Sequence, residues 1–283
     1  MAGHGSGWGF RGSRAAESVA IVGIVNVTPD SFYDGGRYAS VDRALAHALR
    51  LCEEGADVLD IGGESTRPGA KTVSEQEEID RIVPVIEALQ GAVDVPISVD
   101  TSKPEVMRAA VAAGASMIND VRALSLDGAL QAAVDLQVPV CLMHMQGQPG
   151  TMQLEPNYGD VVGEVTQYLR DRVAQCRTAG LGDDLIVVDP GFGFGKTPAD
   201  NIELLSNLGQ LLDIGQPVLI GVSRKSTLGM ITGRELEGRL SASIAGAVLA
   251  VERGASIVRA HDVAETVDAL RVARAVTEAE NSQ

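Results

Sequence analysis

Cysteine, aromatic residues and positive charge are scarce in this sequence. Its 283 residues include 3 Cys, 4 Phe, 4 Tyr and 1 Trp, and 23 Lys and Arg stand against 38 Asp and Glu, for a formal net charge of −15. The cysteines form no C-x-x-C pair and cannot all pair with one another, which is typical of a reducing compartment, so we expect a cytoplasmic protein. The shortage of Lys and Arg argues against nucleic acid and an anionic membrane surface as partners.

Long apolar runs and the signatures of common hydrolases are also missing. The longest apolar runs, such as residues 244–251, fall far short of the ~20 residues that span a bilayer, and residues 1–19 lack the apolar stretch of a secretory signal. With 4 His and no H-E-x-x-H, a zinc hydrolase is not expected. Residues 191–197 resemble a phosphate-binding loop, but Pro190 occupies the position of its first glycine, which argues against a nucleotide triphosphatase.

From residue 20 onward, short runs rich in Val, Ile and Leu alternate with longer amphipathic stretches. This alternation is typical of a parallel sheet whose strands are buried on both faces and connected by helices. The predicted strands are AIVGIVN, DVLDI, PISVD, SMIN, PVCLM, LIVVD, PVLIGV and SIVRA, which begin near residues 20, 57, 96, 116, 139, 184, 217 and 256.

Helix boundaries support the same interpretation. Three pairs read as an N-cap with an acidic partner three residues later: Ser74 with Glu77, Thr197 with Asp200, and Asp262 with Glu265. Three glycines precede strands where a left-handed residue would end a helix: Gly55, Gly114 and Gly254. Eight βα units in about 250 residues predict an α/β protein with a single (β/α)₈ TIM barrel, and a doubly wound open sheet is the alternative. We expect a disordered Gly-rich tail over residues 1–19, the barrel over 20–278 and a C-terminal tail over 279–283.

Polar residues close most of the predicted strands. In a barrel the active site lies at the carboxyl ends of the strands, where Asp100, Asn119 and Asp189 would face one mouth. One such Asp alone could be a helix cap, but together these residues could grip a flat heterocycle with amino and carbonyl edges. Lys225 would add a donor.

A group of cations is predicted at the same mouth. Arg67, Arg259 and His261 indicate an anion there, most simply a phosphate or diphosphate. Two long Gly-rich loops, at residues 28–36 and 62–69, could act as lids.

At these residues the sequence resembles the dihydropteroate synthase family, from about Ile21 to the last helix. The matching segments are NVTPDSF-DGG from Asn26, GGESTRPGA from Gly62, SVDT from Ser98, IND from Ile118, LMHMQGQPGTMQ from Leu142, DPGFGFGKT from Asp189, SRKS from Ser223 and R-x-HD from Arg259. The resemblance implies a (β/α)₈ barrel and a transferase that joins 6-hydroxymethyl-7,8-dihydropterin diphosphate to p-aminobenzoate with Mg²⁺ assistance. It also implies folate biosynthesis, a homodimer, and sulfonamides as competitors of p-aminobenzoate.

The resemblance also implies roles for individual residues. The pterin would be bound by Asp100, Asn119, Met143, Asp189 and Lys225, and the diphosphate by Thr66, Arg67, Arg259 and His261. The p-aminobenzoate would contact Phe32, Pro68, Phe192 and Ser226, and Asn26 would hold the magnesium. The catalytic set would be Arg67, Asp100, Lys225, Arg259 and His261. We expect the charge of Arg259 to face only the diphosphate.

Two other functions remain as alternatives. A pterin-binding methyltransferase shares the barrel and the pterin carboxylates, but the segments 223–226 and 66–68 argue against it. A non-catalytic pterin-binding paralogue would keep the pocket and lose the chemistry, yet Arg67 and the pair Arg259 and His261 are all present.

Overall fold

The structure is a computed structural model, and it describes residues 19–28, 36–65, 72–148 and 150–281. Its strands are β1 (Ala20–Asn26), β2 (Val58–Gly62), β3 (Ile97–Asp100), β4 (Met117–Asp120), β5 (Val140–Met143), β6 (Ile186–Asp189), β7 (Leu219–Ile220) and β8 (Ile257–Ala260). All of them lie within a residue or two of the predicted runs, and each pairs in parallel with its neighbours.

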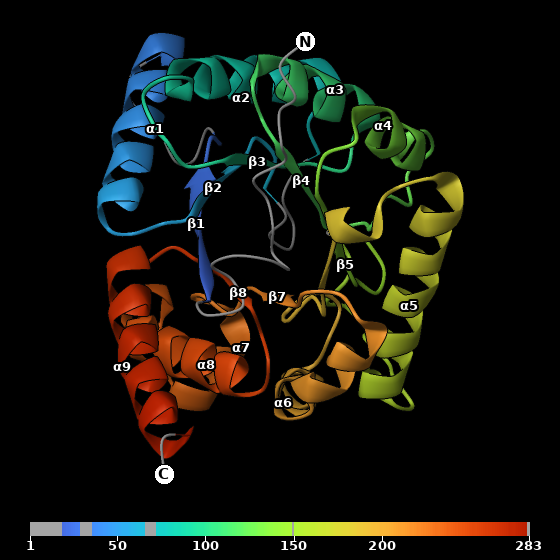
Figure 1. Ribbon diagram of the computed structural model, residues 1–283, viewed down its shortest axis with the longest axis vertical. Coiled ribbons are helices and arrows are strands. Elements are labelled where there is room, and N and C mark those ends of the chain that lie inside the picture. Colours follow the sequence, from blue (N-terminus) through green and yellow to red (C-terminus); the bar gives the residue numbers. More distant parts are fainter. Residues whose placement is uncertain (1–18, 29–35, 66–71, 149, 282–283) are drawn as a thin grey trace.

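Helices connect the strands and surround them as a ring (Figure 1). They are α1 (Gly36–Glu53), α2 (Glu75–Leu89), α3 (Pro104–Ala113), α4 (Ala129–Leu136), α5 (Val161–Ala179), α6 (Pro198–Ser206), α7 (Ser226–Thr232), α8 (Leu240–Glu252) and α9 (Val263–Asn281). Helix α9 therefore continues past residue 278, where the barrel was expected to end. None of the described helices carries an apolar stretch that could span a bilayer.

The sheet closes on itself as a barrel. Its strand order is β6-β5-β4-β3-β2-β1-β8-β7, and the two outer strands meet through a parallel bridge between Val188 and Val218 and a 3.0 Å bond from Val188 N to Pro217 O. Strand β7 is shorter than its predicted run. The (β/α)₈ barrel is confirmed, and the open sheet is excluded by this contact.

The predicted helix ends are largely confirmed. Ser74 caps α2, Thr197 and Asp200 form a capping box on α6, and Gly55, Gly114 and Gly254 all have positive φ. Near the start of α9 the carboxylate of Asp262 instead accepts two hydrogen bonds from Arg224, at 2.9 and 2.5 Å.

The core has an inner and an outer part. The larger cluster fills the space between strands and helices, while the smaller one contains Val22, Val58, Met117, Cys141, Val187, Leu219 and Ile257, all at strand positions. Because side chains alternate along a strand, the residue two positions later lies on the same face, nearer the carboxyl end. Six of these seven steps reach Ile24, Asp60, Asn119, Met143, Asp189 and Arg259, so the smaller cluster lies directly beneath a layer of mostly polar side chains.

Candidate functional site

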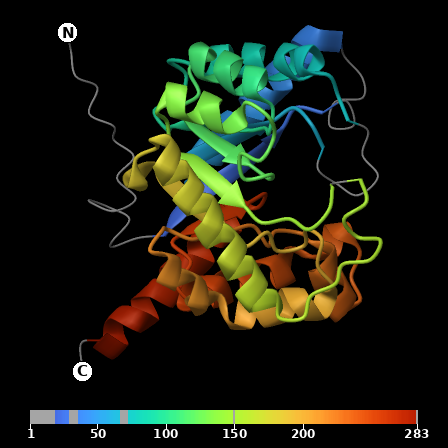
Figure 2. The same cartoon turned by 90° about the vertical axis from the view of Figure 1, so that its right-hand side faces the viewer.

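A cavity lies at the carboxyl ends of the strands. In Figure 2 the arrowheads of the green strands point to the same side of the molecule. The cavity encloses about 470 Å³, including space open to solvent. It is lined by Ile24, Asp100, Asn119, Val121, Met143, Asp189, Gly191, Phe192, Phe194, Gly221, Ser223, Lys225, Arg259 and His261. Nearly every strand therefore contributes to one concave site.

The cavity brings together most of the predicted site residues that the structure describes. They are Asp100, Asn119, Met143, Asp189, Phe192, Lys225, Arg259 and His261. Two others do not line it: Asn26 ends β1 and is partly buried, and Ser226 is an exposed residue at the start of α7. The remaining four, Phe32, Thr66, Arg67 and Pro68, lie outside the described residues.

Arg259 lines the cavity and also contacts Asp100, one of the carboxylates expected to bind the pterin. Its Nε lies 2.6 Å from Asp60 Oδ2 and its terminal nitrogen 2.8 Å from Asp100 Oδ2. The expectation that its charge faces only the diphosphate is therefore wrong, because the guanidinium also binds the carboxylates of Asp60 and Asp100. Burial raises the pKa of Asp100 to about 7, with Arg259 opposing the rise and Asp60 adding to it.

Asp189 and Lys225 form a second acceptor and donor in the cavity wall. Gly191 N donates to Asp189 Oδ1 over 2.7 Å. Burial raises the pKa of Asp189. Burial lowers the pKa of Lys225 to about 8, and the charge of Asp189 opposes that shift. The Lys225 ammonium also lies 3.9 Å from the centre of the Phe194 ring, a cation–π contact.

His261 is neutral at pH 7 in this site. Burial, followed by the charges of Arg259 and Arg224, lowers its pKa to about 4. This shift disfavours a charged ring in the free protein, whereas the expected contact of His261 with a diphosphate stays a prediction. Ser223 Oγ accepts the backbone N–H of His261 over 3.2 Å and lies 3.1 Å from Nδ1 of the ring.

The loop after β6 is folded around a buried lysine. Lys196 Nζ lies 3.0 Å from the carbonyl oxygens of Gly191 and Phe194, and 2.9 Å from Nδ1 of His144. Gly191 has φ +69°, and a Cβ there would lie 1.8 Å from the carbonyl oxygen of His144. A glycine is required at this position, and the lysine holds the loop that carries Phe192 against the cavity.

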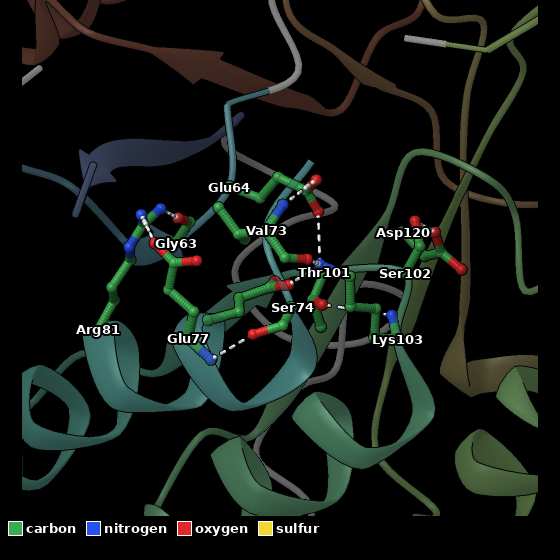
Figure 3. Close-up of polar contacts among 11 residues, drawn as sticks. Gly63, Glu64, Val73, Ser74, Glu77, Arg81, Thr101, Ser102, Lys103 and Asp120 are labelled. Carbon is green, nitrogen blue, oxygen red and sulfur yellow. Dashed lines mark hydrogen bonds and ion pairs between the residues drawn. The ribbon is translucent and has the colours of Figure 1, made fainter. Parts of the chain in front are cut away.

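A second lysine joins the β2, α2 and β3 segments outside the cavity (Figure 3). Lys103 Nζ contacts Glu64 Oε2 at 2.8 Å, the carbonyl oxygen of Val73 at 2.8 Å and Glu78 Oε2 at 2.6 Å. Val73 N also donates to Glu64 Oε1 over 3.3 Å. The Lys103 ammonium thus binds both Glu64 and Val73, which precede and follow residues 66–71 in the sequence.

Sequence reasoning missed several residues that build this site. Asp60, Ser223 and Lys196 were not assigned roles, although each contacts a cavity residue or holds a cavity loop. Asp60 had a detectable signal, because a charged residue inside an otherwise apolar strand is rarely left unpaired. The partners of Lys196 come from distant segments, so no local pattern indicates them.

The described residues contain no cluster of three or more His, Cys, Asp or Glu side chains arranged to hold a metal ion. One pair of oxygens flanks the carboxyl end of β2: a Cβ built on Gly62 would lie 3.8 Å from both Asn26 Oδ1 and Asp100 Oδ2. Mg²⁺ commonly keeps several waters and takes one or two protein oxygens with substrate phosphates. Asn26 fits that mode of binding.

Comparison with known proteins places the chain in a family. The profile of the pterin binding enzymes matches residues 22–261. Dihydropteroate synthase of Escherichia coli K12 is 49% identical over 263 residues, which cover 93% of each chain. The Xanthomonas albilineans dihydropteroate synthase solved with 4-aminobenzoic acid is 56% identical, with a TM-score of 0.87 over 92% of this chain and 94% of that one. The Yersinia pestis dihydropteroate synthase solved with a sulfonamide drug is 48% identical, with a TM-score of 0.88 over 93% and 96%. These comparisons confirm the expected resemblance, and the chain belongs to the pterin binding enzymes of the dihydropteroate synthase type.

Proposed function

We propose that this protein joins 6-hydroxymethyl-7,8-dihydropterin diphosphate to p-aminobenzoate, releasing 7,8-dihydropteroate and diphosphate in folate biosynthesis. The observation that carries the proposal is one cavity in which buried acceptors and a lysine adjoin Arg259 and His261. The Xanthomonas relative holds 4-aminobenzoic acid and the Yersinia relative a sulfonamide drug. Both support a p-aminobenzoate site here, and sulfonamides as its competitors.

The pterin would occupy the deep part of the cavity. Asp100, Asn119 and Asp189 offer acceptors for its amino and ring N–H groups, and Lys225 offers a donor for its carbonyl oxygen. Met143, only 4% exposed, supplies an apolar surface. These groups would fix the heterocycle before the reaction begins, which is where enzymes gain most from preorganisation.

The diphosphate would be bound by Arg259 and His261, which line the cavity, and Thr66 and Arg67 are the further donors that we propose for it. The Ser223 hydroxyl already accepts from the backbone of His261, so its own proton is available to Nδ1 of the ring. The neutral ring would then carry its proton on Nε2 as a donor for a phosphate oxygen.

The reaction we propose begins with cleavage of the bond between the pterin methylene carbon and the diphosphate oxygen. The bonding electrons leave with the diphosphate, and the positive charge left on the pterin is stabilised by the carboxylates of Asp100 and Asp189. Arg67 and Arg259 offset the negative charge that develops on the leaving group. The amine of p-aminobenzoate then attacks the methylene carbon and loses a proton, so no covalent nucleophile is required.

The p-aminobenzoate would enter from the loop side of the cavity. Phe192 is 1% exposed and lines the cavity, so its ring is available to pack against the substrate, together with Phe32 and Pro68. The Ser226 hydroxyl would bind the carboxylate.

Mg²⁺ is the metal we propose for this reaction, held by Asn26 and the diphosphate. When bound, it would offset the charge of the leaving diphosphate. The protein's own contribution is the placement of Asn26 and Asp100 on either side of Gly62, at the carboxyl ends of their strands.

The proposed activity is tested by mixing purified protein with the pterin diphosphate, labelled p-aminobenzoate and Mg²⁺. We expect labelled dihydropteroate in an amount equal to the diphosphate released, and competition by a sulfonamide against p-aminobenzoate. Pterin binding without product would contradict the proposal and favour a non-catalytic paralogue. Activity that persists under a large sulfonamide excess would contradict the inhibitor assignment.

We also propose a cytoplasmic homodimer. Exposed apolar side chains lie on the neighbouring helices α7, α8 and α9, and they are Met230, Ile231, Leu249, Val272 and Val276.

Sedimentation of the wild type should show twice the monomer mass. Met230→Glu with Ile231→Glu should give monomers, whereas Leu154→Glu, at a 76% exposed loop position, should not. A dimer that survives the double substitution would rule out this face.

A further inference from the structure

One carboxylate beneath the cavity has no role in the reaction described above. Asp60 lies in the middle of β2 with 0% of its surface exposed, and it does not line the cavity. Burying a carboxylate is costly unless hydrogen bonds and an opposite charge compensate it. Its partners therefore indicate what its burial achieves.

Both partners of Asp60 are residues of the cavity wall. Asn119 Nδ2 donates to Asp60 Oδ2 over 3.0 Å, and Arg259 Nε donates to the same oxygen over 2.6 Å. The second oxygen, Oδ1, is buried and finds no hydrogen-bond partner among the described residues. Asp60 thus acts on the site through one oxygen shared by two donors.

This contact determines which way the amide of Asn119 faces. An amide can exchange its oxygen and nitrogen by turning about its last side-chain bond. Turning Asn119 would place its oxygen against a carboxylate oxygen, a repulsive contact in a buried site. Asn119 therefore keeps Nδ2 on Asp60, and its Oδ1 is the acceptor that remains for a ligand.

We propose that Asp60 is a positioning residue that fixes the polarity of Asn119 and so selects a ligand edge that carries an amino group over one that carries a carbonyl. The inference rests on the proposed contact between Asn119 and the pterin. A carbonyl at this edge would meet an amide oxygen that cannot turn away. Leaving such a group unpaired weakens binding by roughly 10- to 100-fold.

The test compares two ligands that differ at this edge. One is 6-hydroxymethylpterin, and the other is the analogue in which oxygen replaces the 2-amino group. Calorimetry should give the wild type a preference of at least ~10-fold for the amino form. Asp60→Leu removes the acceptor at similar volume, so the preference should fall several-fold. Asp60→Asn keeps an oxygen but can also turn, so its preference should be intermediate.

A matched control separates this role from a structural one. Asp120 is also fully buried, but its carboxylate binds Ser102 and the backbone N–H groups of Arg122 and Leu124. Asp120→Asn should lower the melting temperature and leave the ligand preference unchanged. A merely structural defect at Asp60 would weaken both ligands equally. An unchanged ratio in Asp60→Leu and Asp60→Asn would therefore overturn the inference.

A further variant keeps the inference testable if neither Asp60 variant folds. Asn119→Ala should reduce the preference as far as Asp60→Leu would, because the selection passes through the amide. Full preference in Asn119→Ala would overturn the inference while leaving the pterin assignment intact. Failure of the wild type to bind either ligand would overturn the pterin assignment and this inference with it. Asp189 contributes equally to the preference for the amino ligand in every variant, so its contribution cancels when the variants are compared.

Discussion

Replacing Arg259 should damage stability, pterin binding and turnover together, because its guanidinium neutralises two carboxylates, of which Asp60 is buried and Asp100 largely so. Arg259→Met keeps most of the aliphatic stem and removes the charge. Asp60 and Asp100, at 2.6 and 2.8 Å, would both lose their partner. Breaking a buried pair costs about 3–5 kcal/mol, and the side chain of Arg259 is 20% exposed, so the lower end applies. At ~2 °C per kcal/mol, the melting temperature should fall by ~6 °C.

The same substitution should also weaken binding of the bare pterin. Arg259 opposes the rise in the pKa of Asp100, so its loss would favour the protonated form of Asp100, which is a weaker hydrogen-bond acceptor than the carboxylate. Turnover should fall by at least ~100-fold, as when one charge-stabilising donor is lost.

The assay combines thermal unfolding, calorimetry with the pterin and steady-state kinetics. Arg271→Met is the control, because Arg271 pairs with Asp268 at 3.7 Å on the exposed face of α9 and should change nothing. Adding Asp60→Leu to Arg259→Met removes one unpaired carboxylate and should recover part of the lost stability. The reasoning is refuted if Arg259→Met retains the wild-type melting temperature and pterin affinity.

Three further predictions follow from the other buried charges. The value of kcat/KM should rise with pH as Asp100 ionises near pH 7 and fall as Lys225 loses its proton near pH 8. Asp100→Asn should remove the rise on the acid side. A value of kcat/KM that does not change with pH would contradict these assignments. Lys196→Met should raise KM for p-aminobenzoate at least ~10-fold with little effect on pterin binding, because the substitution frees the loop that carries Phe192. An unchanged KM would show that this loop keeps its conformation without the lysine. Lys103→Met leaves two carboxylates without their cation and should lower the melting temperature by several degrees, whereas an unchanged melting curve would show that this cluster contributes nothing.

The fold was predictable because its signals are local. Buried parallel strands need continuous branched aliphatic runs, and each helix end needs a cap or a left-handed residue. The sequence predicted two such N-caps, at Ser74 and Thr197, and a left-handed residue at Gly114, and the structure has all three. Strand β7 was overestimated because an apolar run shows burial and not how many of its residues join the ladder.

Only those site residues whose location follows from their place at the end of a strand could be predicted from the sequence. The carboxyl end of a barrel strand points into one mouth, so Asp100, Asn119 and Asp189 could be assigned from their places alone. Which cation pairs with which carboxylate depends on the geometry across the barrel. The contacts of Arg259 with Asp60 and Asp100 were therefore missed. The lowered pKa of His261 was missed as well, because burial dominates it.

The tight turn at Gly191 limits how this protein could evolve drug resistance. Even one methyl group there would collide with the main chain of His144, so a bulkier residue cannot narrow the cavity from that point of its wall. Selection under an antifolate would have to remodel the flanking segments, where side chains can change without separating adjacent strands.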